Sequence, residues 1–367
     1  MTDDRLAPIR AVAEAAGLDA IALVPGANFR RLFGRDFHQN ERPLVVVIPV
    51  EGPPAAVVPD LELNGFAQVR LDGEVIPWRD QDGYAAAFDR LGRVLSPRRI
   101  GVEGQQMRVF VQFALMRAFP GAEIVDAHLP VSALRLRKTP SEIASMRQAI
   151  AVTERAFAGA FGEVRAGLTE AQVESILLRR LFEEGAEDIA FQPIVAAGTN
   201  SAMPHAKARR DYAIRPGDAL LFDFGARIDG ICADLTRTVF VGHVDDADAA
   251  FYENVQAANA AGCAASGPGA TAHQVDDAAT SVLESGPYAR FIRAKTGHGL
   301  GLDIHEAPYI MRGNHVRLEP GMVFTVEPGL YDLDRLGVRI EDDILITETG
   351  AESLTSYPRE LTLVGTG

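Results

Sequence analysis

The sequence predicts an α/β protein of two domains, and three observations support this prediction. Residues 8–130 alternate strand-like and helix-like segments, which is typical of a small α/β domain. A strong helix-start signal follows near residue 139. The rest of the 367-residue chain contains one short unit twice, which indicates a pseudo-two-fold domain of α+β type. We therefore place the first domain at residues 1–134 and the second at residues 135–367.

Several segments of the first domain have a clear pattern. Short apolar runs predict strands at residues 20–25, 44–50 and 55–60. The stretch "GYAAAFDRLGRVL", residues 83–95, predicts a helix, and "RIGVEG", which begins at Arg99, predicts a further strand. Strands and helices in alternation support an α/β arrangement of this domain.

Two helices should open the second domain, because each begins with a capping box. Thr139 can cap the first helix, with Pro140 as its first residue and Glu142 three residues after the cap, and the helical pattern continues to about Phe161. The second pattern, in residues 168–186, has a threonine cap and a glutamine three residues later, at Thr169 and Gln172.

The internal repeat concerns acidic residues. "PGDALLFDFG" from Pro216 and "PGMVFTVEPG" from Pro320 align without a gap, and each carries an acid seven residues after the proline, Asp223 and Glu327. A second acid follows each of them, Asp234 after 11 residues and Glu341 after 14. A unit of turn, strand, acid, loop, strand and acid therefore occurs twice.

Each unit predicts a hairpin that brings its two acids together. If Asp223 faces Asp234, the turn lies at Ile228–Asp229, and facing Cβ atoms are about 4.5–5.5 Å apart. Two buried carboxylates repel each other, and a divalent cation between them removes the conflict. The same pairing joins Glu327 to Glu341. A single acid in a strand is more often solvated, so the hypothesis depends on the repeat.

An imidazole belongs to the same prediction. His298 lies between two glycines in "KTGHGLGLDIHEAP", where backbone and side chain can approach a site closely. Four carboxylates and one imidazole suit two divalent ions about 3.5–4 Å apart. Oxygen-rich ligation favours Mn²⁺, and the imidazole also allows Co²⁺ or Zn²⁺.

Composition limits the classes of function. The net charge of −14 argues against nucleic acid as a partner. Residues 1–138 contain 17 acids and 17 bases, whereas residues 139–367 contain 33 acids and 19 bases. That excess fits either a carboxylate-lined cation site or a solubilising surface. No apolar run reaches the ~20 residues of a membrane helix. The acidic, polar start of the chain and its two cysteines favour the cytoplasm.

The motifs resemble those of a known family. "FDFGARIDGICADLTRT", "TGHGLGLDIHE", "TVEPGLY" and "GVRIEDD" are similar to motifs of the pita-bread (M24-type) metallopeptidases, the family of prolidase, aminopeptidase P and methionine aminopeptidase. The order and spacing of all five candidate ligands agree with the family. "VPGANFRRLFG" and "ERP" in the first domain resemble the creatinase-type N-terminal domain of prolidases. The resemblance implies a creatinase-like α/β domain followed by a pita-bread catalytic domain.

The resemblance also implies a role for each residue. Asp223 and Asp234 would hold one metal ion, His298 and Glu327 the other, and Asp234 and Glu341 would bridge the two ions. Glu327 would also carry a proton. The remaining catalytic residues would be a substrate-contacting histidine, a histidine beside the scissile carbonyl and an arginine that orders the site, namely His205, His305 and Arg339.

The implied activity is that of a dinuclear exopeptidase that cleaves the bond before proline, either a Xaa-Pro dipeptidase or a Xaa-Pro aminopeptidase. Hydroxide generated at the metals would attack the peptide carbonyl. By analogy with two-domain relatives, the chain would form a homodimer and act on small peptides. Three alternatives are a non-proline aminopeptidase or dipeptidase, a creatinase-like amidohydrolase and a non-catalytic binding protein. All five candidate metal ligands are present, which makes the amidohydrolase and the binding protein less favourable interpretations.

Four residues also have simpler interpretations from sequence alone. His205 follows a proline in a loop and would then lie at the surface, Arg339 could face outward from a strand, and His305 could cap a helix. Cys232 is expected to be a small buried residue and not a ligand. In "AKARRDY" the basic pair Arg209–Arg210 either forms a solvated turn or attracts a substrate carboxylate, which would favour acidic-residue peptides.

Overall fold

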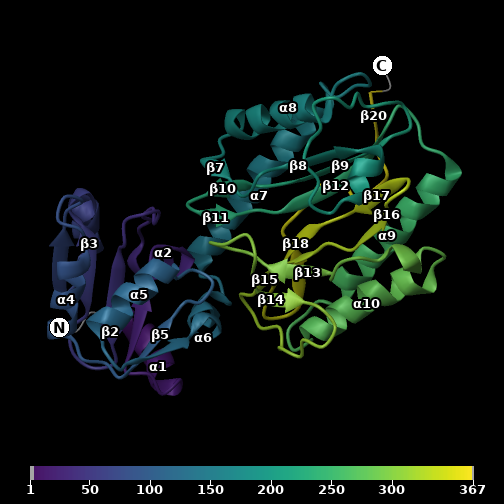
Figure 1. Ribbon diagram of the computed structural model, residues 1–367. Coiled ribbons are helices and arrows are strands. Elements are labelled where there is room, and N and C mark those ends of the chain that lie inside the picture. Colours follow the sequence, from purple (N-terminus) through teal and green to yellow (C-terminus); the bar gives the residue numbers. More distant parts are fainter. Residues whose placement is uncertain (1–3, 366–367) are drawn as a thin grey trace. The chain divides into compact units, whose positions relative to one another are not determined.

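The protein is an α/β structure, as predicted (Figure 1). The computed structural model describes residues 4–365, which form two compact units divided between Arg135 and Leu136. Within the described part, none of the helices is long and apolar enough to cross a membrane.

The N-terminal unit is built on a six-stranded sheet with the order β4-β3-β2-β1-β5-β6. β2 pairs antiparallel with β1 and β3, whereas the outer pairs β3–β4, β1–β5 and β5–β6 are parallel. The strands predicted from apolar runs are thereby confirmed. The strands are β1 (Ala20–Leu23), β2 (Val45–Pro49), β3 (Ala55–Pro59), β4 (Glu74–Trp78), β5 (Arg99–Val102) and β6 (Glu123–Asp126).

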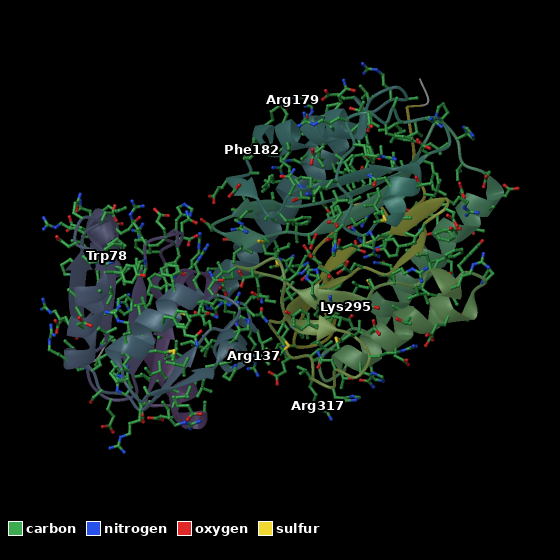
Figure 2. All side chains as sticks on the ribbon, in the orientation of Figure 1. Trp78, Arg137, Arg179, Phe182, Lys295 and Arg317 are labelled. Atoms are coloured by element: carbon green, nitrogen blue, oxygen red, sulfur yellow. The ribbon has the colours of Figure 1, made fainter. Side chains whose placement is uncertain are left out.

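Helices cover both faces of this sheet. Successive side chains of a strand point to opposite faces, so β1 contributes to a core on each side. Ala20 and Ala22 pack with α4 and α5, while Ile21 and Leu23 pack with α1 and α2. Trp78, labelled in Figure 2, belongs to the first of these two cores. The helices are α1 (Ala7–Ala15), α2 (Ala27–Phe33), α3 (Leu63–Phe66), α4 (Ala85–Val94), α5 (Val109–Ala118) and α6 (His128–Ser132), with 3₁₀ turns at Asp4–Leu6, Asp60–Glu62, Ala67–Val69 and Ala133–Arg135.

The C-terminal unit consists of two similar halves, each a helix pair followed by strands (Figure 1). The first half contains α7 (Pro140–Phe161), α8 (Glu170–Glu183), β7 (Asp188–Ile189), β8 (Ile194–Ala197), a 3₁₀ turn at Gly198–Ala202, β9 (Ala219–Phe224), β10 (Ala226–Ile228), β11 (Ile231–Cys232) and β12 (Leu235–Val241). The second half contains α9 (Asp246–Ala265), α10 (Ala272–Ser285), a 3₁₀ turn at Ala289–Phe291, β13 (Gly297–Gly299), β14 (Glu306–Ile310), β15 (Val323–Val326), β16 (Gly329–Asp332), β17 (Leu336–Arg339) and β18 (Asp342–Ile346). β19 (Ala351–Ser353) and β20 (Leu363–Val364) follow.

The two halves also agree in their sheets. β9 lies between β8 and β12 in one sheet, and β15 lies between β13 and β18 in the other. Each half adds a short ribbon, β10–β11 in the first and β16–β17 in the second. The pseudo-two-fold arrangement that the repeated acidic unit predicted is therefore present.

Capping boxes start the helices at the predicted positions. Thr139 accepts a hydrogen bond from the Glu142 backbone, and Thr169 does the same for Gln172. The second half repeats the second box at the start of α10, with Thr271 as its cap. Thr169 and Thr271 also form equivalent isolated bridges, to Ala213 and Arg317, and each of these partners stands three residues before a Pro-Gly turn. The repeat thus extends beyond the acidic unit to the helix that precedes it.

The predicted turn of the first hairpin is wrong by one residue. Ile228 pairs with Ile231, so the turn residues are Asp229 and Gly230, with φ angles of 51° and 76°. A tight hairpin turn needs two left-handed residues, and Asp-Gly adopts that conformation more easily than Ile-Asp. In consequence Asp223 faces Thr236 and not Asp234. Asp234 is a diagonal neighbour of Asp223.

The second hairpin keeps the predicted pairing. Val326 pairs with Asp342 on one side, and Gly329 pairs with Arg339 on the other. If this register continues between the two pairs, Glu327 lies opposite Glu341.

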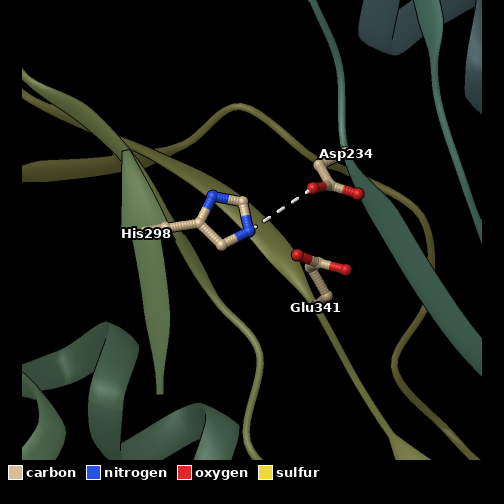
Figure 3. A group of neighbouring side chains, drawn as sticks. All are labelled: Asp234, His298 and Glu341. Carbon is tan, nitrogen blue, oxygen red and sulfur yellow. Dashed lines mark ion pairs between the residues drawn. The ribbon is translucent and has the colours of Figure 1, made fainter. Parts of the chain in front are cut away.

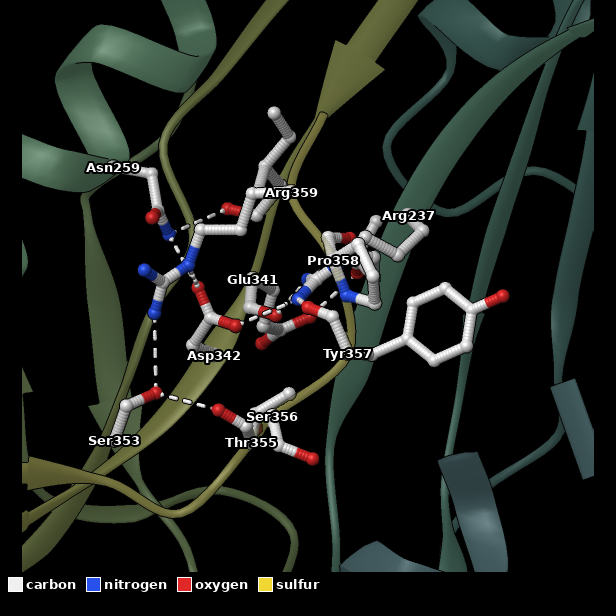
Figure 4. A network of polar contacts seen from close by, with 12 residues as sticks. Arg237, Asn259, Glu341, Asp342, Ser353, Thr355, Ser356, Tyr357, Pro358 and Arg359 are labelled. Atoms are coloured by element: carbon white, nitrogen blue, oxygen red, sulfur yellow. Dashed lines mark hydrogen bonds and ion pairs between the residues drawn. The ribbon is translucent and has the colours of Figure 1, made fainter. Parts of the chain in front are cut away.

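A buried ionic network joins the two hairpins (Figure 4). Arg237 on β12 lies 2.8 Å from the carboxylate of Asp342 on β18, and both side chains are buried. Arg237 also donates to the Glu341 backbone carbonyl at 2.6 Å. Arg359 and Asn259 bind the other oxygen of Asp342, at 2.7 and 3.0 Å. This network fixes the strand that follows Asp234 against the strand that follows Glu341.

Removing the central carboxylate should therefore destabilise the C-terminal unit. We expect Asp342→Ala to lower the free energy of unfolding by about 3–5 kcal/mol, because Arg237 is left buried without its partner. Urea denaturation, monitored by circular dichroism, would measure this loss of free energy of unfolding.

The matched control is Glu352→Ala, which removes the partner of Arg147 at 2.7 Å in a pair whose side chains are 42% and 45% exposed. An exposed pair of this kind contributes at most about 1 kcal/mol. Equal losses of stability in the two variants would contradict the role we give to the network.

Candidate active site

All eight residues predicted for the site line one cleft of about 1650 Å³ in the C-terminal unit. The cleft lies between the two halves of this unit, since both hairpins contribute to its wall. The eight residues are His205, Asp223, Asp234, His298, His305, Glu327, Arg339 and Glu341.

The acids occupy the points where the two hairpins leave their sheets. Asp223 is near the end of β9, and Asp234 directly precedes β12. Glu327 lies between β15 and β16, and Glu341 between β17 and β18. At such breaks the side chains are held by regular strands on both sides, so the backbone can place carboxylates in the cleft with little freedom of movement.

Two glycines let the central histidine approach these acids. A Cβ atom on Gly297 would lie 1.9 Å from the Thr325 carbonyl oxygen, and one on Gly299 would lie 2.2 Å from that of Ala307. Any side chain at either position would push the neighbouring strands apart. The expectation that glycines permit a close backbone approach at His298 is therefore confirmed.

Three of the predicted ligands converge around one point (Figure 3). One ligand atom each of Asp234, His298 and Glu341 lies within 4.8 Å of the others. His298 Nε2 is 3.8 Å from Asp234 Oδ2 and 3.2 Å from Glu327 Oε1. His298 Nδ1 lies 3.1 Å from the Gly299 carbonyl oxygen, to which it donates a hydrogen bond. Nε2 is therefore the ring nitrogen that faces the carboxylates.

The carboxylates of the cleft are electrostatically strained. Burial, followed by repulsion from neighbouring carboxylates, raises the pKa of Asp234 and of Glu341 well above the usual range. Burial also raises the pKa of Asp223, although Arg339 opposes this. One oxygen of each acid is buried and has no hydrogen-bond partner among residues 4–365, namely Asp223 Oδ1, Asp234 Oδ1 and Glu341 Oε1. Divalent cations would satisfy these oxygens, so the residues present fit a metal centre.

Arg339 points into the site, so the outward-facing alternative is wrong. Its buried guanidinium binds the carboxylate of Asp223 and donates to the Tyr331 hydroxyl at 2.9 Å and to Thr236 Oγ1 at 3.2 Å. Thr236 Oγ1 in turn donates to Glu341 at 2.5 Å. Arg339 therefore connects acids from both hairpins. Sequence reasoning missed Tyr331 and Thr236, although both stand inside the motifs that contain the acids.

The two outer histidines differ in their surroundings. His205 is exposed in a loop, as its simpler interpretation held, but this loop lines the cleft. His305 lies in a bend before β14, so the helix-cap alternative is wrong. Its ring centroid is 3.9 Å from that of His298. His305 is an exposed residue, but partial burial of its ring and the neighbouring His298 lower its pKa to about 4, so its imidazole is neutral near pH 7 and can donate one hydrogen bond.

The basic pair in the loop after His205 divides into two roles. Arg209 is absent from the cleft lining, because it lies 2.7 Å from the fully buried Glu170 and stacks on Tyr212 at 3.8 Å. A buried carboxylate needs a charged partner, which explains this use of Arg209. Arg210 and Lys207 do line the cleft. Arg209 is thus excluded from contact with a substrate, whereas Arg210 lies where such a contact is possible, and attraction of a substrate carboxylate stays a prediction for Arg210 alone.

Cys232 is fully buried, as expected. Burial raises the pKa of its thiol to about 11, which disfavours the thiolate that a metal ligand requires.

Comparison with known proteins agrees with this geometry. Residues 144–348 match Metallopeptidase family M24, and residues 5–137 match the Creatinase/Prolidase N-terminal domain. The chain belongs to metallopeptidase family M24. The enzyme is therefore a metallopeptidase with the N-terminal domain of the creatinase and prolidase group.

Named relatives cover nearly the whole chain. A probable dipeptidase PepE of Mycobacterium tuberculosis is 36% identical over 370 residues, 98% of this chain and 96% of that protein. The structure of a prolidase from Thermococcus sibiricus matches with a TM-score of 0.93 and 31% identity, over 99% of both chains. A Xaa-Pro dipeptidase from Bacillus anthracis matches with a TM-score of 0.89 and 30% identity, over 98% of this chain and 99% of that one. The chain is thus similar to dipeptidases and prolidases.

Arg339 offers a test of the site's geometry. In Arg339→Lys the charge stays, but one ammonium cannot reach Asp223, Tyr331 and Thr236 together. We expect kcat/KM for peptide hydrolysis to fall about 100-fold or more, as it does when reacting groups are misplaced by about 1 Å.

Steady-state kinetics on a metal-loaded sample would measure this loss. The same substitution at Arg335, which forms a pair with Asp248 outside the cleft, should leave kcat/KM unchanged. An Arg339→Lys enzyme with wild-type kinetics would show that the guanidinium does not order the site.

Proposed function

We propose that this enzyme is a dinuclear metal-dependent exopeptidase that hydrolyses the peptide bond before proline, as a Xaa-Pro dipeptidase or Xaa-Pro aminopeptidase. The observation that carries the proposal is the set of three buried, unpartnered carboxylate oxygens beside His298 in one cleft. The relatives named as a prolidase and as a Xaa-Pro dipeptidase support proline specificity.

Five side chains would hold the metal ions. Asp223 and Asp234 would bind one ion, His298 and Glu327 the second, and Asp234 and Glu341 would bridge them. The oxygen-rich donor set favours Mn²⁺, with Co²⁺ or Zn²⁺ as alternatives. When bound, the ions supply Lewis-acid activation of a water molecule.

The chain's own groups would perform the remaining steps. Burial opposes ionisation of Glu327, but the neighbouring His298 ring and the guanidinium of Arg339 outweigh it and lower the pKa of Glu327. Glu327 is therefore a carboxylate that can take a proton from the attacking water and pass it to the leaving amine. The neutral His305 can donate a hydrogen bond to the scissile carbonyl oxygen as negative charge develops there. His205 would contact the substrate from the loop.

A second specificity has a specific observation in its favour. Lys207 and Arg210 line the same cleft, and positive side chains at this point would favour a substrate with a carboxylate. A dipeptidase without a strict need for proline, acting for instance on acidic residues, is therefore the alternative. A creatinase-like amidohydrolase and a binding protein have less support, because the five candidate ligands and their arginine are complete.

The proposal extends to assembly and location. A homodimer follows only by analogy with two-domain relatives, and light scattering that returned a monomer would exclude it. A cytoplasmic location is consistent with two free cysteines, Cys232 and Cys263.

The metal centre can be tested by one ligand substitution. We expect wild-type protein to bind two Mn²⁺ ions per chain and Asp234→Asn to lose at least one of them, as measured by metal analysis after gel filtration. Activity should fall by more than about 100-fold, since even residues behind metal ligands commonly contribute 10–100-fold.

Controls separate this effect from misfolding. Without metal, Asp234→Asn should unfold at the same temperature as wild type or higher, because a buried carboxyl with a raised pKa destabilises the folded state once it is ionised. Asp277→Asn, which changes an exposed acid paired with Arg312, should leave metal content and activity unchanged. Wild-type activity in Asp234→Asn would overturn the metal assignment.

Hydrolysis of a panel of peptides, assayed with Mn²⁺, would identify the substrate class. Ala-Pro cleaved alone would establish a dipeptidase with proline specificity, and cleavage of Ala-Pro-Ala would establish an aminopeptidase. Preference for Asp-Ala would establish the alternative specificity. No turnover of any of them would exclude the proposed peptidase activity.

A further inference from the structure

Each half of the C-terminal unit has a buried carboxylate on its second helix that the proposed function does not use. Glu170 is the first residue of α8, and Asp276 lies in the second turn of α10. Both side chains are buried, so each needs partners that satisfy its charge. α8 contacts β8, and α10 contacts β14, so both helices lie beside segments that reach the cleft (Figure 1). We call Glu170 and Asp276 the clamp carboxylates.

Glu170 holds both ends of residues 197–209. Its Oε1 accepts a hydrogen bond from the Ala197 backbone amide at 2.7 Å, and its Oε2 accepts one from the Arg209 backbone amide at 2.6 Å. The guanidinium of Arg209 also donates to Oε1 at 2.7 Å. Residues 203–209 contain neither helix nor strand. The position of this loop therefore depends on the carboxylate that joins its ends.

Asp276 holds both ends of residues 296–312 with the same geometry. Its Oδ1 accepts a hydrogen bond from the Thr296 backbone amide at 2.8 Å, and its Oδ2 accepts one from the Arg312 backbone amide at 3.0 Å. The carbonyl oxygen of Thr296 in turn accepts a hydrogen bond from the Glu327 amide at 2.7 Å. Asp276 is thereby connected to the backbone of a proposed metal ligand as well as to its own segment.

The histidines that line the cleft all lie in these two segments. His205 belongs to residues 197–209, and His298 and His305 belong to residues 296–312. The proposed acidic ligands, by contrast, stand on the two hairpins. Strand pairing thus places the carboxylates of the cleft, whereas the clamp carboxylates place its imidazoles.

The clamp carboxylates do not occupy equivalent positions of the repeat. Glu170 directly follows the cap of α8, whereas Asp276 stands five residues after the cap of α10. The residue of α8 that aligns with Asp276 is Glu174, which accepts a hydrogen bond from the Gln192 side chain at 2.7 Å. The same geometry thus occurs at two positions about one helical turn apart. This favours a role in the site over simple duplication of the repeat.

We propose that the clamp carboxylates are positioning residues, through which Glu170 controls substrate binding by His205 and Asp276 controls metal affinity by His298. This inference rests on the peptidase function proposed above and adds two residues on which its substrate and metal contacts depend. A carboxylate that accepts one amide from each end of a segment fixes both ends at once. Its loss therefore frees the whole segment, and the imidazole loses its fixed position in the cleft.

The first test measures Mn²⁺ binding by calorimetry. In Asp276→Asn one carboxylate oxygen becomes an NH₂ group, which cannot accept a hydrogen bond from a backbone amide. We expect the dissociation constant for Mn²⁺ to rise at least about 10-fold, as it commonly does for changes behind a metal ligand. Asp277→Asn, which changes the neighbouring exposed acid, should keep the wild-type value, and so should Glu170→Gln.

The second test separates KM from kcat for hydrolysis of Ala-Pro by metal-loaded enzyme. Glu170→Gln should raise KM about 3- to 10-fold, the value of one hydrogen bond, and should change kcat much less. In a His205→Ala background the same substitution should have no further effect on KM, because Glu170 acts through that histidine. Glu183→Gln, which changes an exposed acid of α8 paired with Arg179, should keep the wild-type KM.

Two milder variants apply if either substitution prevents folding. Asn200→Ala removes a side-chain amide that donates to Glu170 Oε2 at 2.9 Å. Asp276→Glu keeps the charge but shifts the carboxylate by one methylene group. Each should reproduce, to a smaller extent, the effect on KM or on Mn²⁺ affinity of the variant that it replaces.

Four results would overturn the proposal. The first two are wild-type Mn²⁺ affinity in Asp276→Asn and wild-type KM in Glu170→Gln. The third is a loss of Mn²⁺ affinity in Glu170→Gln as large as that in Asp276→Asn, since a general loss of structure would then explain both variants. The fourth is additive effects of Glu170→Gln and His205→Ala on KM.

Failure of the proposed function would look different. If wild type bound no Mn²⁺ and hydrolysed no peptide, the peptidase proposal would fail, and amide hydrogen exchange would test the clamp carboxylates. Faster exchange confined to residues 197–209 in Glu170→Gln, and to residues 296–312 in Asp276→Asn, would support their positioning role. Unchanged exchange in these segments would overturn it.

Discussion

Mutual repulsion among buried carboxylates is the constraint around which the C-terminal unit is arranged. Asp223, Asp234 and Glu341 are shielded from water, and within the described part of the chain each has one oxygen without a hydrogen bond. Such groups oppose folding, because burial and like charges both disfavour their ionised forms. The rest of the unit must therefore supply the free energy that holds them together, and the strain has a use only if cations enter the cleft.

Charges placed beside and behind the acids provide that support. Arg339 faces Asp223 from within the cleft, so part of the repulsion is balanced directly. Arg237 and Asp342 form a buried pair behind it and connect the two hairpins through side chain and backbone. The ligands thus stand on strands whose positions are fixed by contacts that do not themselves touch a substrate, which is how a pre-organised site keeps its geometry.

The features that the sequence predicted are those set by local chemistry. Capping boxes at Thr139 and Thr169 need only residues three apart, and the aligned acids are fixed by covalent spacing, so both were correct. The turn failed because pairing Asp223 with Asp234 ignored the preference of Asp229–Gly230 for left-handed backbone. Arg209 could not be assigned, since its partner Glu170 is 39 residues away in sequence and meets it only in the folded chain. Burial of Arg339 depends on tertiary packing in the same way.

The acidic excess of the second domain has both of the explanations that composition allowed. Five of the 33 acids in residues 139–367 line the cleft, namely Glu174, Asp223, Asp234, Glu327 and Glu341. Others, such as Glu163 and Glu284, form exposed ion pairs with arginines. Exposed charges are screened over about 8 Å at physiological ionic strength, whereas charges inside a cleft are screened much less. The net charge of −14 therefore has little influence on what enters the site. Charges that line the cleft itself, such as these five acids and Arg339, act on a bound peptide at much shorter range.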